Sequence, residues 1–301
     1  MTTGATEAKA AQCHIAVRFH APPPDLARFF TTFYRVEIAV PEGERVADAL
    51  QPEWGNLRFF AGDLPVSRSA SGDVVCDADF APTGPSTGPL QFTLGNTRIW
   101  GIGLLPLGWA TFIGQPADRM ANRVFDGRAE PAFAPFGPLA DDLTERGDRE
   151  DEEFERLVRF FRHEAPRHGK EDPRIGAIHA MLLEHDLPSV AAMAERAGLN
   201  QRTLERLTTR AFGFPPKILL RRQRFMRSLA NFMLDPSGKW SASIDTRYCD
   251  QSHFVRDCRE FLGMTPSEYA AMDHPVMASF LRERQRAYGS AVQTLDPPAR
   301  G

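Results

Sequence analysis

The chain has 301 residues, enough for two domains of ordinary size that each bury a core. Hydrophobic residues make up 42% and charged residues 25%, and the net charge is −3. These values exclude a disordered chain and a uniformly basic coat protein for nucleic acids. The four cysteines, at positions 13, 76, 249 and 258, form no C-x-x-C pair and are too few for a disulfide framework. We therefore expect a reducing compartment, the cytoplasm.

The first twelve residues have neither the basic start nor the apolar stretch of a signal peptide, and we expect a disordered tail over 1–12. The segment from Ile99 to Ala117 is uncharged, but it contains four glycines and two prolines. Unpaired backbone is costly in lipid, so this composition favours a buried strand followed by a turn. No membrane association is expected.

Short apolar runs separated by Pro and Gly fill the chain before about residue 135. Ile15, Val17 and Phe19 alternate in the first run, and similar runs lie at 34–40, 92–94 and 99–102. This alternation is typical of half-buried antiparallel strands. It predicts a β-rich domain over 13–137, for which a cupin-like architecture is one candidate.

The composition changes at Leu139. Between Leu139 and Glu164 acidic residues outnumber arginines ten to five, and four apolar side chains recur at helical spacing. We expect one connecting amphipathic helix within an acidic linker over 138–170. Helical patterns then fill 171–272, which predicts an all-α domain. The tail over 273–301 contains the stretch VMASFLRERQRAY, which suits a helix packed on either domain or on a partner.

Basic residues gather within the predicted all-α domain. Arg202 to Arg227 contains eight cations and one acid, although a run of charge on a helix is often only a solvated face. The same domain also repeats itself at an offset of fifty residues, as in Asn200 and Asp250, or Gly213 and Gly263. Two copies of one unit imply that the same task is performed twice.

Each copy can be interpreted as a helix-turn-helix. In the first, Ser189 caps a short helix, Gly198 makes the turn, and Asn200 caps a second helix that Gly213 ends. The second helix of such a unit lies in the major groove, where Arg suits guanine and Gln suits adenine. The residues predicted to contact DNA here are Gln201, Arg202, Glu205, Arg206 and Arg210.

The second copy has its own capped helix, which Asp250 begins. Its predicted DNA contacts are Gln251, Ser252, His253 and Arg256. Pro216 to Leu234 is predicted to be a helical spacer, whose length of about 28 Å approaches the ~34 Å between successive major-groove faces.

These segments resemble a known family. DQSHFVRDCREFLGMTPSEY (250–269) and LNQRTLERLTTRAFGFPPK (199–217) are similar to the two motifs of AraC/XylS-type transcription regulators. The resemblance implies a bacterial DNA-binding regulator that acts on RNA polymerase. Its N-terminal domain would sense a small-molecule effector or form a homodimer. Control by a protein partner, and an enzyme with an appended DNA-binding domain, are the alternatives.

The second motif departs from the family pattern at three positions. Ala242, Ser243 and Arg247 replace the usual apolar-Ala pair and turn glycine. A non-glycine residue in a left-handed turn costs roughly 1 kcal/mol, so the second reading helix is expected to dock more weakly.

Aromatic residues of the N-terminal region are candidates for an apolar effector pocket, with a packed β core as the alternative. The pocket candidates are Trp54, Trp100, Trp109 and Phe112.

We expect no catalytic residues, metal site or cofactor. The G-x-S-x-G match at 84–88 lies among prolines and lacks the strand and helix of a nucleophile elbow. His163, Glu164 and His168 miss the spacing of a zinc motif. Gly101 and Gly103 lack the third glycine of a dinucleotide fingerprint.

Overall fold

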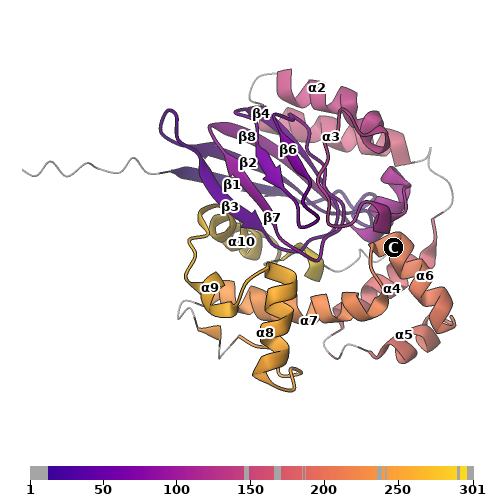
Figure 1. Cartoon of the computed structure of the whole chain (residues 1–301). Helices are drawn as coiled ribbons and strands as arrows, with labels where there is room; N and C mark the ends of the chain where they lie inside the picture. The colour runs from indigo at the N-terminus through magenta and orange to yellow at the C-terminus, as the bar shows by residue number, and fades with distance from the viewer. Residues whose placement is uncertain are drawn as a thin grey trace, which may run out of the picture.

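A computed structural model describes residues 13–145, 149–165, 171–184, 186, 188–235, 239–240, 243–289 and 292–296. The tail expected over 1–12 lies outside these residues. Within them, strands occupy the N-terminal region and helices the C-terminal region, as the sequence predicts (Figure 1). No helix of the described part of the chain is long and apolar enough to cross a membrane.

Two antiparallel sheets of four strands each form the N-terminal region. The first sheet contains, in spatial order, β1 (His14–His20), β2 (Phe30–Ala39), β8 (Thr97–Leu104) and β4 (Asn56–Gly62). The second contains β3 (Val46–Leu50), β7 (Leu90–Leu94), β5 (Val66–Arg68) and β6 (Val74–Cys76). The four strands expected from alternation are present as β1, β2, β7 and β8.

Short helical turns connect the sheets to the rest of the chain. They are α1 (Pro106–Gly108), the π-helical η1 (Trp109–Ile113), η2 (Ala117–Arg119) and η3 (Pro131–Phe136). The segment from Ile99 to Ala117 is thus a buried strand followed by short helical turns.

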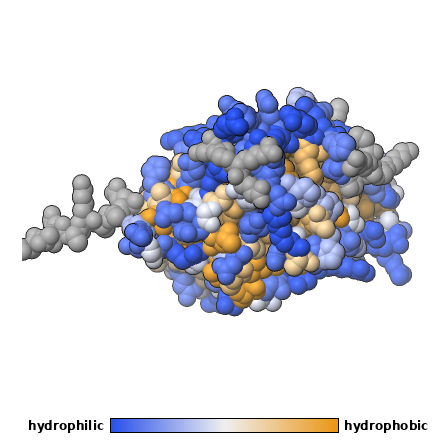
Figure 2. Space-filling view, turned by 90° about the horizontal axis from the view of Figure 1, so that it is seen from above, coloured by the Kyte–Doolittle hydropathy of each residue, from blue (hydrophilic) through white to orange (hydrophobic). Residues whose placement is uncertain are grey.

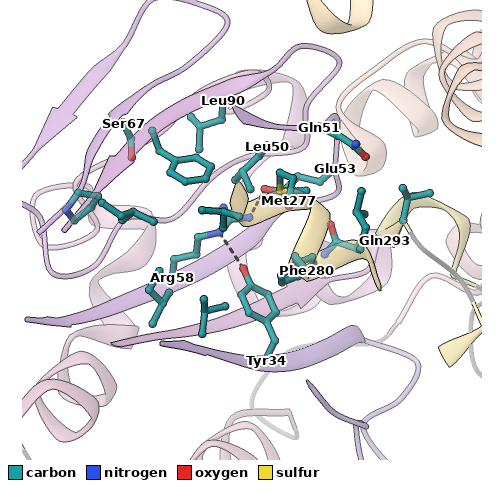
Figure 3. Close-up of a pocket in the computed structure, with 18 of the residues that line it drawn as sticks. Tyr34, Leu50, Gln51, Glu53, Arg58, Ser67, Leu90, Met277, Phe280 and Gln293 are labelled. Carbon is teal, nitrogen blue, oxygen red and sulfur yellow. Dashed lines mark hydrogen bonds and ion pairs between the residues drawn. The ribbon is translucent and has the colours of Figure 1, made fainter. Parts of the chain in front are cut away.

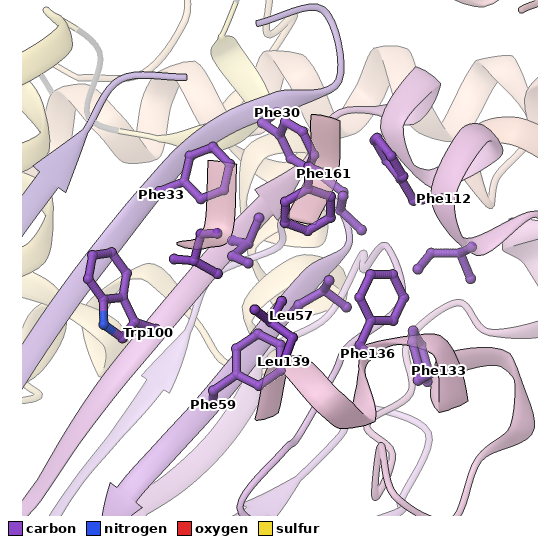
Figure 4. Close-up of a cluster of buried hydrophobic side chains, with 14 of the residues drawn as sticks. Phe30, Phe33, Leu57, Phe59, Trp100, Phe112, Phe133, Phe136, Leu139 and Phe161 are labelled. Carbon is purple, nitrogen blue, oxygen red and sulfur yellow. The ribbon is translucent and has the colours of Figure 1, made fainter. Parts of the chain in front are cut away.

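The acidic segment forms two helices, α2 (Gly137–Glu145) and α3 (Glu150–Glu164), so the expectation of one connecting helix is corrected. Both cover the outer face of the first sheet (Figure 1). Leu157 and Phe161 of α3 join a large aromatic cluster with Phe30 and Phe33 of β2 (Figure 4). Because their apolar faces are buried there, these helices are part of the N-terminal core. The surface seen from that side is largely hydrophilic (Figure 2).

The C-terminal region is helical. Its elements are α4 (Pro173–Leu183), α5 (Val190–Arg196), α6 (Gln201–Phe212), α7 (Pro216–Leu234), α8 (Gln251–Leu262), α9 (Pro266–Ala270), α10 (Pro275–Tyr288) and η6 (Gln293–Leu295). The predicted spacer is α7, with the expected bounds. It lies between α6 and α8 and beneath the sheets (Figure 1).

The C-terminal helix α10 returns to the N-terminal region and packs on β1 and β3. Asp48 of β3 holds its first turn, because one carboxylate oxygen accepts hydrogen bonds from the backbone N–H groups of Val276 and Met277 at 3.0 and 2.9 Å. The helix expected in the tail over 273–301 therefore packs on the N-terminal region. The two regions of the chain therefore share a core.

Candidate nucleic-acid interface

The first helix-turn-helix has the predicted local structure. Ser189 Oγ accepts a hydrogen bond from Ala192 N at 3.1 Å, and Asn200 Oδ1 accepts one from Thr203 N at 2.8 Å. Gly198 and Gly213 have φ values of +64° and +86°, which glycine adopts without strain. The caps and glycines fix the ends of α5 and α6, and so the orientation of α6.

The reading face of α6 is open to solvent. Its inner face, with Leu204, Thr208 and Phe212, is buried. All five residues predicted to contact DNA from this helix are exposed: Gln201, Arg202, Glu205, Arg206 and Arg210. Arg206 and Arg210 also line a groove that α6 shares with residues 107–115 of the N-terminal region. The face thus offers both hydrogen-bonding side chains for base edges and cations for phosphates.

The second reading helix, α8, is capped in the same way. Asp250 Oδ1 accepts a hydrogen bond from His253 N at 2.8 Å, and this bond lowers the pKa of Asp250. Phe254, Cys258 and Phe261 are buried. The four residues predicted to contact DNA are all exposed: Gln251, Ser252, His253 and Arg256.

The segment before α8 differs from the segment before α6, which contains the helix α5. No α-helix lies between α7 and α8 in the residues that the structure describes there, which exclude Ala242 but include the buried Ser243. Arg247 is not among the described residues with positive φ. The expectation of backbone strain at this position is therefore wrong. Its guanidinium instead binds the carboxylate of Asp245 at 2.5 Å. The turn is held by this pair and needs no glycine.

Asp257 anchors α8 on the spacer helix. Its side chain is 3% exposed and accepts hydrogen bonds from Arg221 Nη2 at 2.5 Å and Tyr248 Oη at 2.8 Å. Arg224 Nη2 lies 3.4 Å from Asp257 Oδ2, the oxygen that also accepts from Tyr248. The neighbouring carboxylates of Asp257 and Glu260 raise the pKa of Arg221. Spacing along the chain does not reveal this network, because Arg221 and Asp257 are 36 positions apart.

The structure divides the basic stretch from Arg202 to Arg227 into an exposed group and a group that faces the protein. Arg202, Arg206, Arg210 and Lys217 are exposed. The other four cations face the protein. Arg221 and Arg224 bind Asp257, Arg227 Nη2 donates to the carbonyl of Glu184 at 2.6 Å, and Arg222 is buried.

Arg222 joins the spacer helix to the N-terminal region. Its guanidinium carbon lies 3.9 Å above the ring of Trp54, and Nη1 donates to the carbonyl of Ser86 at 2.9 Å. Burial lowers the pKa of Arg222 to about 9, so it stays charged at neutral pH. The buried His179 meets Trp54 edge to face, and desolvation together with the charge of Arg222 lowers its pKa to about 3. His179 is therefore neutral.

The four aromatic pocket candidates are packed in cores. Trp100, Trp109 and Phe112 belong to the aromatic cluster beneath α3, where Figure 4 shows Trp100 and Phe112, and Trp54 lies in the cluster below α6. None of the four lines the apolar cavity found between the two sheets. The packing agrees with the alternative of a packed core for these four residues.

That cavity has a volume of about 90 Å³. Strands of both sheets form its walls, and α10, η6 and Met226 of α7 close it (Figure 3). Sequence analysis missed its polar residues, although Arg58 within the apolar strand segment NLRFF was a usable signal. The polar residues of its lining include Tyr34, Gln51, Glu53, Arg58 and Gln293.

No cluster of three or more His, Cys, Asp or Glu side chains able to hold a metal ion occurs in the described ranges. Cys13, Cys76 and Cys249 are exposed, and Cys258 is buried in the core beneath α8, where burial raises its pKa.

Comparison with known proteins identifies the helical region. Residues 193–272 match the family described as a helix-turn-helix domain, and this range runs from within α5 to just past α9. No curated protein sequence matches the chain significantly.

Several solved structures show a distant likeness. ToxT from Vibrio cholerae is 10% identical, with 86% of this chain and 97% of that chain covered and a TM-score of 0.41. ToxT bound to an unsaturated fatty acid gives 10% identity, coverage of 90% and 98%, and a TM-score of 0.38. The AraC-like transcriptional activator CuxR is 15% identical, with 72% of this chain and 87% of that chain covered and a TM-score of 0.30. These scores are too low to carry an inference about ligands.

Proposed function

Residues 193–272 belong to the helix-turn-helix family of AraC-type transcription regulators, and we propose that the chain reads two adjacent major-groove sites through α6 and α8. The observation that carries this proposal is the pair of capped helices that expose matching faces on either side of α7. Arg206 and Arg256 occupy equivalent positions on the two faces, and both are exposed. Nineteen helical residues between them provide a span of about 28 Å, close to one turn of duplex.

The proposed division of labour follows from exposure. Arg202, Arg206 and Gln201 provide base contacts from α6, and Gln251, Ser252 and Arg256 provide them from α8. Arg210 and His253 lie further along the exposed faces and are assigned to phosphates or flanking bases. The four inward-facing arginines of α7 are assigned to holding the domain together.

We also propose that a small molecule modulates this reading. Met226 of α7 and the C-terminal helix α10 close the apolar cavity, so an occupant touches the helix that separates the two readers. A ligand that favours one position of α7 would change the relative placement of α6 and α8. This route passes through α7 and α10, whereas α3 covers the other face of the first sheet.

Cytoplasmic action, contact with RNA polymerase and formation of a homodimer belong to the same proposal. Control by a protein partner is the competing version. Sedimentation of the purified chain with and without operator DNA measures the oligomeric state.

Selection of bound duplexes from a random DNA pool tests the proposed reading. We expect two half-elements about one helical turn apart, with a steep dependence of affinity on salt. Enrichment of one short element would show that α8 does not read bases. A chain that enriches no sequence would contradict the proposed function. An Arg149→Ala variant, whose exposed side chain lies at the start of α3 and pairs with Glu152, serves as the matched control.

A further inference from the structure

The cavity between the sheets is apolar over most of its wall. Val36, Phe60, Phe92, Ile99 and Phe280 are among its lining residues. Its volume of about 90 Å³ is of the same order as the ~150 Å³ engineered cavity that binds benzene in another protein. The space thus suits a compact apolar molecule about the size of a single ring, and a long chain would have to displace the wall.

One end of the cavity contains a charged group that is already neutralised. Arg58 is 8% exposed, and its Nη2 donates to Glu53 Oε1 at 2.6 Å. Its Nε donates to Tyr34 Oη at 2.9 Å, and Nη1 donates to Thr83 Oγ1 at 3.1 Å (Figure 3). All three nitrogens of the guanidinium are engaged. A ligand carboxylate would have to displace Glu53, so the cavity disfavours an anion.

Tyr34 at this end is also satisfied. Its hydroxyl accepts from Arg58 and donates to Asn56 Oδ1 at 3.2 Å, and burial raises its pKa to about 12. The position of its ring depends on Gly101 in the neighbouring strand, where a Cβ would lie 1.9 Å from Tyr34 Cζ. The polar groups of Tyr34 and Arg58 are therefore already paired within the protein. This end of the cavity offers a ligand mainly van der Waals contact.

Two amide groups on the cavity lining are not satisfied. Gln51 is 6% exposed, and its Nε2 donates to Tyr269 Oη at 3.0 Å, but its Oε1 is buried without a hydrogen-bond partner in the described structure. Gln293 repeats the arrangement, since its Nε2 donates to Thr31 Oγ1 at 3.0 Å while its Oε1 has no partner. A buried polar atom left unpaired costs about 1–3 kcal/mol.

Gln293 occupies a place prepared by the neighbouring sheet. A Cβ on Gly103 would lie 2.1 Å from Gln293 Nε2, so this glycine leaves room for the amide. If either amide is turned over, its NH₂ group becomes the unpaired end. A hydroxyl group satisfies both arrangements, because it donates and accepts hydrogen bonds.

From these observations we infer that the cavity is a binding site for a small, neutral, apolar molecule that carries one hydroxyl group, which donates a hydrogen bond to the unpaired amide oxygen of Gln51 or of Gln293. The inference rests on the proposed small-molecule control only for its effect on DNA. Binding itself is independent of DNA, so the two can fail separately.

Calorimetric titration of the full-length chain with phenol, toluene and benzoate tests the ligand class. The three probes share a ring and differ only in the polar group. We expect phenol to bind most tightly, toluene about tenfold more weakly because it leaves the amides unpaired, and benzoate not measurably. Benzoate binding equal to that of phenol, or no binding by phenol, would overturn the inference.

Two variants locate the binding site. Leu90→Trp fills the cavity and should abolish phenol binding, whereas Val66→Trp places the same side chain at an exposed position of β5 and should leave binding unchanged. Retained phenol binding in Leu90→Trp would place the ligand elsewhere.

Glu53→Gln removes the counter-charge of Arg58 and should raise benzoate affinity at least tenfold with little change for phenol. This gain does not depend on the folding of the tryptophan variant.

DNA binding by the same samples separates the two proposals. If phenol binds as described but no DNA sequence is selected, the proposed regulator function fails and the ligand site stands. If DNA is selected but phenol does not bind, only the ligand site fails.

Discussion

The two reading helices of this chain are capped alike but supported differently. The first, α6, follows a short helix and a glycine turn and packs its inner face into a core that includes Trp54 and Leu105 of the N-terminal region. The second, α8, has no helix before it in the described residues, and a buried carboxylate, Asp257, ties it to arginines of α7. Repeated sequence therefore does not imply repeated support. Apolar packing orients one reader, and an ionic network together with its aromatic core orients the other.

The largest expected effect comes from breaking the ionic support of α8. Asp257→Ala leaves Arg221 and Arg224 without their shared partner and should lower the free energy of unfolding by about 3–5 kcal/mol. Denaturant titration measures this loss. Glu260→Ala removes the more exposed partner of Arg221, with 43% of its side chain accessible, and should cost less than about 1 kcal/mol. Equal losses in the two variants would show that Asp257 is not an anchor.

DNA affinity compares the readers directly. Arg206→Ala should weaken specific binding by about 1–3 kcal/mol, and Arg256→Ala by less, because the residues described before α8 form no α-helix that matches α5 before α6. Titration of the selected duplex with each variant measures both values. Equal losses at the two positions would contradict the stronger role given to α6.

Acid should weaken the support of α6. The pKa of His179 is about 3 in the folded chain and near 6.5 when unfolded, so the unfolded state binds the extra proton as pH falls below 6.5. Stability is then complete above pH 6.5 and should fall by about 2 kcal/mol between pH 7 and pH 5 from this residue.

Unfolding measured at both pH values in His179→Leu checks the assignment, since this part of the pH dependence should disappear. His14→Leu alters an exposed histidine of β1 and should leave the pH dependence unchanged. Identical pH dependence in His179→Leu and the unaltered chain would rule out His179 as the source.

The smallest effect concerns salt. Arg210→Ala should reduce the slope of log affinity against log salt by about one, because one phosphate contact is lost. Arg227→Ala should leave the slope unchanged, since Arg227 donates to the backbone of Glu184. A reduced slope in Arg227→Ala would mean that α7 also contacts phosphates.

Local signals explain most of what the sequence predicted. The ends of α6 and α8 follow from Asn200, Asp250 and the glycines at 213 and 263, which act within one turn of helix. β5 and β6 were missed because three-residue strands are too short to show alternation.

Long-range contacts account for the rest. The inward turn of Arg222 depends on Trp54, which is 168 positions away in the chain. The cavity likewise brings Gln51 and Gln293, from opposite ends of the sequence, into one lining. Side-chain types and spacing contain no record of such pairings. For the same reason the sequence left a pocket and a packed core both open for Trp54, Trp100, Trp109 and Phe112, which pack in cores.

The position of α10 in the chain has a consequence for biosynthesis. The sheets that form the walls of the cavity are made first, but α10 and η6, which close it, follow both reading helices. During translation the cavity is complete only after the DNA-binding domain has been made. A ligand bound there would meet a finished regulator and could not be captured by a nascent N-terminal region on the ribosome.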